Sequence, residues 1–137
     1  EFGTKSNRNS RDHFEYVKKR QVLVLTWEGL QTSPEGIFKS FKHQLDRLAR
    51  SHHSLGVTLD LDSCSEAEGM SAAPVIGFSA TELYSLAALA GSQIKVKFFE
   101  LAEVAPPLDI AERSSRIAAE LIYAFLRGRA IALASMA

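Results

Sequence analysis

Two carboxylates at the end of an apolar segment are the residues of this chain best suited to chemistry. Residues 57–62 read V-T-L-D-L-D and carry Asp60 and Asp62. Because side chains alternate between the faces of a strand, both carboxylates are predicted to point the same way. Like charges held together need a cation or a shared proton, and carboxylate oxygens suit Mg, Mn and Ca. We therefore expect these two carboxylates to bind a metal ion. The alternative is that one of the two Asp residues caps a turn at the end of the strand and the other is solvated.

A third acidic candidate, Glu103, follows the next apolar segment, as Asp62 follows the one before it. In a parallel sheet both strands end at one rim, where open α/β sheets bind ligands. Glu103 is therefore expected beside the Asp pair, with a solvated loop carboxylate as the alternative and Glu100 as a second choice within the strand. His52 and His53 are expected at the C-terminus of a helix, where a cation complements the helix dipole. Cys64 is expected to pack in the interior of the protein.

Three strands and four helices are predicted to position these residues. The strands are expected over Val22–Leu25, Val57–Leu61 and Ile94–Leu101. The first two helices are expected over Arg11–Lys19 and from Ser33-Pro34-Glu35 to about Arg50. The third runs from the capping box Ser79–Glu82 to about Ala90, where Gly91 closes it, and the fourth runs from Asp109 to about Arg127. Residues 1–9 are expected to be loop, and the structure of the tail 128–137 is left open. The alternation of strands and helices predicts an α/β fold with a parallel sheet covered by helices. Three such strands leave an apolar edge, so further strands are expected on this chain or a partner.

The bulk composition narrows the class of protein. The 137 residues fit a single domain, 1–137, and 16 basic side chains balance 16 acidic ones, so no basic face for nucleic acid or a membrane surface is expected. Charges interrupt the apolar stretches before they reach bilayer length. A single cysteine excludes an internal disulfide framework, and a cytoplasmic location is expected.

Several short motifs follow one another in an order that resembles a known family. They are T-L-D-L-D (Thr58–Asp62), Glu68-Gly69, Ala73-Pro74, Gly77-Phe78-Ser79, Glu82-Leu83 and E-V-A-P-P-L-D (Glu103–Asp109). Over roughly residues 20–127 the chain resembles the C-terminal half of the ureohydrolases, the family of arginases, agmatinases and formimidoylglutamases. The S-A-x-P loop is most similar to formimidoylglutamase.

The resemblance implies a three-layer α/β/α fold with a parallel sheet and a binuclear manganese site. Asp60 and Asp62 match metal ligands of the family, and Asp60 and Glu103 are the residues expected to serve catalysis. Glu103 matches the glutamate beside the guanidino or formimino group. The implied reaction is hydrolysis at the C=N carbon of a small amino-acid-derived substrate, such as formimidoylglutamate, by a hydroxide bridging the metals.

Some elements of the family pattern are absent. The G-G-x-H and D-x-H-x-D motifs that supply the other ligands do not occur, and Ala105 replaces the usual Asn of E-x-N-P. We therefore expect a C-terminal fragment of a longer domain that associates with the missing N-terminal half or forms a homo-oligomer. An inactive ureohydrolase-like domain with an assembly or regulatory role is the alternative. A further alternative is a phosphatase of the haloacid-dehalogenase type, because the D-x-D-x-[TV] strand of that family resembles Thr58–Cys64.

Overall fold

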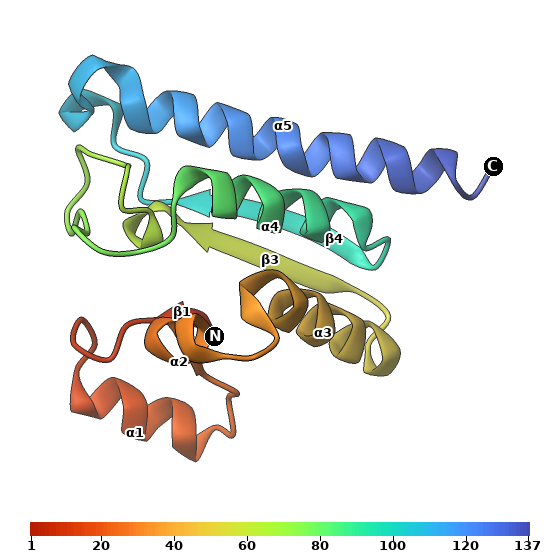
Figure 1. Cartoon of the computed structure of the whole chain (residues 1–137), viewed down its shortest axis with the longest axis horizontal. Coiled ribbons are helices and arrows are strands. Elements are labelled where there is room, and N and C mark those ends of the chain that lie inside the picture. Colours follow the sequence, from red (N-terminus) through yellow and green to blue (C-terminus); the bar gives the residue numbers. More distant parts are fainter. The chain divides into compact units, whose positions relative to one another are not determined.

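The computed structural model describes residues 1–137, which form two compact units, Glu1–Phe41 and Lys42–Ala137 (Figure 1). Each unit contains a two-stranded parallel sheet. None of the helices combines the length and the apolar character that a membrane crossing requires.

The first unit is built around a short pair of strands. It contains β1 (Phe2–Thr4), α1 (Arg11–Lys19), β2 (Leu25–Thr26), α2 (Trp27–Thr32) and the first residues of α3 (Gly36–Ser51). Ser10 caps α1 by accepting a hydrogen bond from the backbone N–H of His13, so the predicted first helix is confirmed. The expected loop over residues 1–9 is wrong for β1, because the backbone N–H of Leu25 donates to the carbonyl of Glu1 and aligns the two segments.

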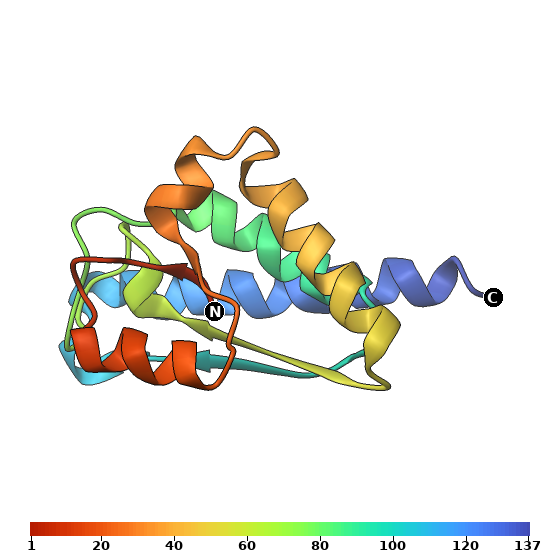
Figure 2. The ribbon, with the colours of Figure 1, turned by 90° about the horizontal axis from the view of Figure 1, so that it is seen from below.

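The second unit carries the elements around the candidate carboxylates. It contains the rest of α3, β3 (Leu55–Asp60), a 3-10 turn (Leu61–Ser63), α4 (Ala80–Ser92), β4 (Val96–Ala102), two further 3-10 turns (Pro106–Leu108 and Ile110–Glu112) and α5 (Arg113–Ala134). Strands β3 and β4 pair in parallel, with Leu59 opposite Leu101, and their arrowheads point to the same end in Figure 2. The described chain has four strands in two parallel pairs, β1 with β2 and β3 with β4, where the sequence indicated three strands.

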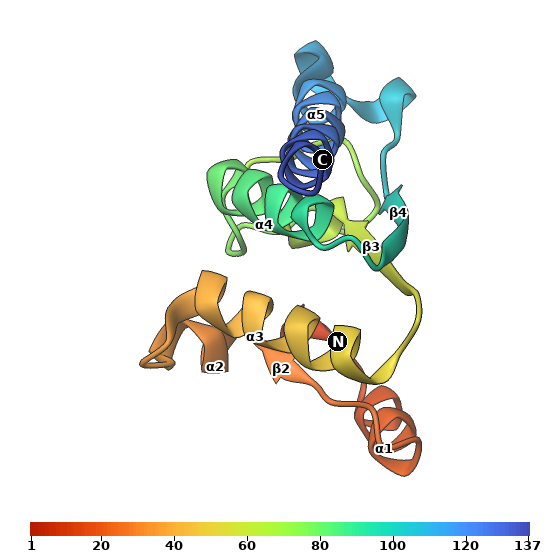
Figure 3. The ribbon, with the colours of Figure 1, turned by 90° about the vertical axis from the view of Figure 1, so that its right-hand side faces the viewer.

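Helices α4 and α5 lie on one face of β3 and β4 (Figure 3). Phe125 of α5 stacks on Phe99 of β4, with ring centroids 4.4 Å apart. The two helices approach closely at two glycines: a β-carbon on Gly91 would overlap the carbonyl of Phe125, and one on Gly128 would overlap the carbonyl of Ala88. The helix crossing therefore depends on glycine at both positions.

These contacts explain where the helices end. The capping box of Ser79 and Glu82 is confirmed at the start of α4, but Gly91 lies inside the helix instead of closing it, because it forms part of the crossing with α5. For the same reason α5 continues past the predicted end at Arg127, through Gly128 and most of the tail.

The start of α5 also differs from the prediction. Ala111 and Glu112 have left-handed φ angles of 54° and 58°, so the regular helix begins after them. Asp109 is not the N-cap residue of α5, which is Glu112, but its carboxylate still accepts hydrogen bonds from the backbone N–H groups of Ser114 and Ser115 at 2.9 and 2.7 Å. These hydrogen bonds therefore reach the first turn of α5 across an irregular segment.

Candidate functional site

The carboxyl ends of β3 and β4 bring two of the three candidate carboxylates to one rim of the sheet. Asp60 is the last residue of β3 and pairs with Ala102, the last residue of β4. Glu103 follows directly and has a left-handed φ of 60°, which turns the chain out of the strand. The predicted placement of both strand ends at one rim is confirmed.

Asp62 reaches the same region by another route. The strand ends at Asp60, and a 3-10 turn over Leu61–Ser63 follows, so the expectation that both Asp side chains share one strand face is wrong. The physical reason is that Asp60 Oδ1 accepts a hydrogen bond from the backbone N–H of Asp62 at 2.8 Å and caps the turn. Asp60 is exposed, whereas the Oδ1 atom of Asp62 is shielded from solvent.

The carboxylate of Glu103 is oriented by a residue that the sequence did not indicate. The hydroxyl of Ser71 donates to Glu103 Oε2 at 3.2 Å. Glu100, the second choice in the sequence, lies within β4 instead and accepts a hydrogen bond from the hydroxyl of Thr58 at 3.1 Å across the sheet face. Of the two glutamates, Glu103 is therefore the one at the rim.

The loop that carries Ser71 is fixed to the segment that follows Glu103. Ser114 is 1% exposed as a residue. Its hydroxyl accepts a hydrogen bond from the backbone N–H of Glu68 at 2.7 Å and donates one to the carbonyl of Glu68. Gly69, with φ +72°, packs directly on the backbone of Leu108. These contacts of Glu68 and Gly69 hold residues 64–79 against the segment 103–112 and the start of α5, and we call the two segments 64–79 and 103–112 the rim loops.

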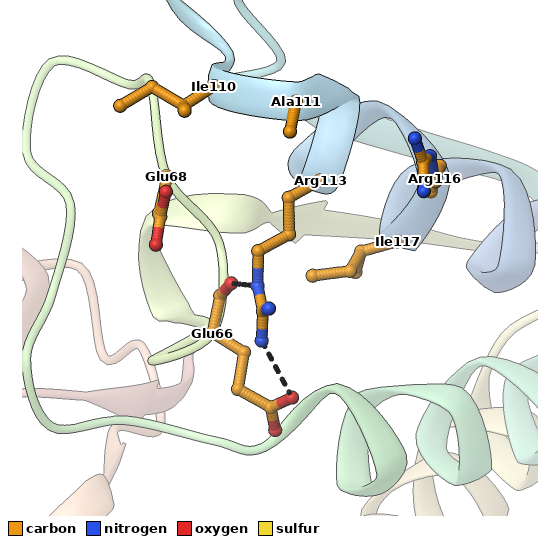
Figure 4. Close-up of a pocket in the computed structure, with 7 residues that line it drawn as sticks. All are labelled: Glu66, Glu68, Ile110, Ala111, Arg113, Arg116 and Ile117. Carbon is orange, nitrogen blue, oxygen red and sulfur yellow. Dashed lines mark hydrogen bonds and ion pairs between the residues drawn. The ribbon is translucent and has the colours of Figure 1, made fainter.

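A charged cavity of about 440 Å³ lies between this loop and the start of α5 (Figure 4). Arg113 Nε donates to the carbonyl of Glu66 at 2.6 Å, and its Nη2 lies 3.6 Å from Glu66 Oε2. The same carboxylate accepts from the backbone N–H of Ala80 at 3.0 Å, so Glu66 links α5 to the first residue of α4. The lining consists of Glu66, Glu68, Ile110, Ala111, Arg113, Arg116 and Ile117.

The cavity and the candidate carboxylates are separate features of the rim, because neither Asp60, Asp62 nor Glu103 lines the cavity. Cys64 is fully buried, as its predicted packing role requires, and burial raises the pKa of its thiol.

The carboxylates suit a hard divalent cation in kind but not in number. Asp60 and Asp62 present oxygen ligands of the type that Mn and Mg prefer. However, no group of three or more His, Cys, Asp or Glu side chains is arranged to hold a metal ion. Further ligands must therefore come from outside these residues if a metal binds here.

Comparison with known proteins decides the family. The sequence profile of the arginase family matches residues 1–127. The chain belongs to the arginase family. It is 28% identical over 133 residues to a formimidoylglutamase of Halalkalibacterium halodurans, a match that covers 96% of this chain and 41% of the relative.

Solved structures show the same fold. A formimidoylglutamase of Bacillus subtilis is similar with a TM-score of 0.88 and 26% identity, covering 94% of this chain and 41% of that protein. A formiminoglutamase of Trypanosoma cruzi, solved with Mn²⁺, has a TM-score of 0.79 and 23% identity, covering 93% and 43%. The chain therefore has part of an arginase-type α/β fold and spans about two fifths of the length of these relatives.

The family assignment confirms the resemblance to ureohydrolases of the formimidoylglutamase type. The phosphatase and the inactive-domain alternatives gain no support. Manganese, the substrate and the cytoplasmic location stay predictions.

Proposed function

We propose that these residues form part of a manganese-dependent hydrolase that cleaves a C–N bond at the guanidino or formimino carbon of a small amino-acid derivative. Formimidoylglutamate is the preferred substrate, because the relatives in H. halodurans and B. subtilis are formimidoylglutamases. Manganese is preferred because the T. cruzi relative was solved with it. Since the chain spans about two fifths of these proteins, the activity is proposed for the assembled arginase fold.

The observation that carries this proposal is the parallel pairing of β3 and β4, in which Asp60 lies opposite Ala102 and directly precedes the turn to Asp62. In the proposed site Asp60 and Asp62 are ligands of the cation. A bound divalent metal lowers the pKa of water, which is the chemistry that hydrolysis needs.

Glu103 is proposed to bind the cationic end of the substrate. A carboxylate forms a charge-assisted hydrogen bond with a guanidinium or formimino N–H, and this bond is stronger than a neutral one. Ser71 orients the carboxylate of Glu103, and the contact of Ser114 with Glu68 holds the loop that carries Ser71. The chain's own contribution is thus to hold an acidic rim in a defined position.

The test is a set of matched carboxamide variants in a protein that carries these residues within the complete arginase fold. Asp60→Asn and Asp62→Asn are each expected to remove tightly bound Mn²⁺, measured as metal content after gel filtration. Glu103→Gln is expected to keep the metal and lose most of the turnover of formimidoylglutamate, with arginine and agmatine assayed beside it. Glu100→Gln, which changes a carboxylate on the sheet face, is the control. Unchanged metal content in both Asp variants would refute the site.

A further inference from the structure

The charged cavity beside the start of α5 contains one carboxylate without a partner in the chain. The Glu66 carboxylate and the Arg113 guanidinium offset each other, since Arg113 Nη2 lies 3.6 Å from Glu66 Oε2. Glu68 differs, because Ser114 bonds only to its backbone N–H and carbonyl, and its carboxylate forms no hydrogen bond or ion pair with the chain. Since Glu68 lines the cavity, its negative charge is available to a cation.

Arg116 provides the opposite charge. Its Nη2 lies 3.8 Å from Glu112 Oε2, and the two side chains are 74% and 79% exposed. An ion pair this exposed contributes little, because water and salt screen it and two long side chains lose freedom when they pair. The guanidinium is therefore able to bind a carboxylate through two parallel hydrogen bonds. Figure 4 shows Glu68 and Arg116 at opposite ends of the cavity, with Arg113 between them.

Apolar side chains complete the lining between these two charges. They belong to Ile110, Ala111 and Ile117, and Ile110 is 71% exposed. Aliphatic carbon that packs on such side chains leaves water, which favours binding. The cavity volume of about 440 Å³ is within the range of pockets that bind small organic molecules, about 300–1,000 Å³. The cavity thus has a negative end, an apolar wall and a positive end.

We propose that this cavity binds an ω-amino carboxylate, a linear zwitterion whose ammonium and carboxylate groups are separated by an aliphatic chain. The ammonium pairs with Glu68, the carboxylate pairs with Arg116, and the aliphatic chain packs on the apolar wall. An α-amino acid has both charges on one carbon and does not reach both ends. The cavity is separate from the acidic rim, because Asp60, Asp62 and Glu103 do not line it, so this binding does not depend on the proposed hydrolysis.

The test is a titration of the full 137-residue chain with ε-aminocaproate, followed by NMR of labelled isoleucine methyl groups. The methyl signals of Ile110 and Ile117 are expected to shift, and that of Ile131, near the other end of α5, is expected to stay in place. Caproate and hexylamine each lack one charged group, and glycine lacks the chain, so each is expected to bind about tenfold more weakly or less. Absence of binding, or equal binding of caproate or hexylamine, overturns the proposal.

Matched variants locate the ligand. Glu68→Gln and Arg116→Gln are each expected to weaken ε-aminocaproate binding about tenfold or more, because each removes one charge partner. Arg116 and Ile117 also line a neighbouring cavity of about 430 Å³, which Glu120 and Tyr84 line as well. Glu120→Gln is therefore the control and is expected to bind as the parent chain does. Equal loss in all three variants places the ligand elsewhere and overturns the proposal, as does an unchanged affinity of the Glu68 variant.

Discussion

Replacement of Gly69 by alanine tests how tightly the two rim loops are held together. Gly69 has a φ of +72°, and an added β-carbon would overlap the carbonyl of Leu108 and lie 2.5 Å from the α-carbon of Asp109. Left-handed backbone at a residue with a β-carbon costs about 1–2 kcal/mol. Overpacking adds about 1–3 kcal/mol, because the atoms in the way belong to the backbone and cannot rotate aside. We expect a loss of about 3 kcal/mol in the free energy of unfolding, roughly the sum of these two terms.

Gly36→Ala is a control that separates the two costs. Gly36 also has a left-handed φ, +68°, but no atom lies within 4 Å of the position that its β-carbon would take. Its variant is therefore expected to lose only about 1 kcal/mol. Urea titration with hydrogen exchange, read by mass spectrometry on peptides from each unit, measures both variants. Equal destabilisation would show that the packing of Gly69 against Leu108 contributes nothing.

Three further predictions concern the same region. Ser114→Ala is expected to cost about 1–3 kcal/mol in urea unfolding, because the backbone groups of Glu68 lose a buried partner; a change below about 0.5 kcal/mol would contradict this. Loss of hydration raises the pKa of Asp109, but hydrogen bonds from Ser114 and Ser115 outweigh it and leave that pKa below its usual value. This interaction therefore stabilises the fold above about pH 3.9 and is lost as the pH falls through the lowered pKa, so Asp109→Asn should weaken the acid dependence of the melting temperature between about pH 2 and 5. Burial raises the pKa of the Cys64 thiol, so we expect Ellman's reagent at pH 8 to label it only after urea unfolds the chain; rapid labelling of the folded protein would contradict its burial.

The sequence by itself determined the features that depend on neighbouring residues. The capping box of Ser79 and Glu82 starts α4, and Ser10 starts α1, because a side chain and a backbone N–H three positions away suffice for each cap. The alternation of strand and helix predicted the parallel pairing of β3 with β4. That pairing placed Asp60 and Glu103 at one rim without any knowledge of distant contacts.

Only the tertiary structure decided the features that depend on distant residues. Glycine at position 91 predicted the end of the helix, yet Gly91 lies inside α4, where it contacts α5 at the crossing of the two helices. Ser71 and Ser114 carry no motif, and their roles follow from partners 32 and 46 positions away. The physical reason is common to these three residues: a local pattern specifies how a segment begins, whereas atoms from distant parts of the chain decide where it ends and which side chains meet.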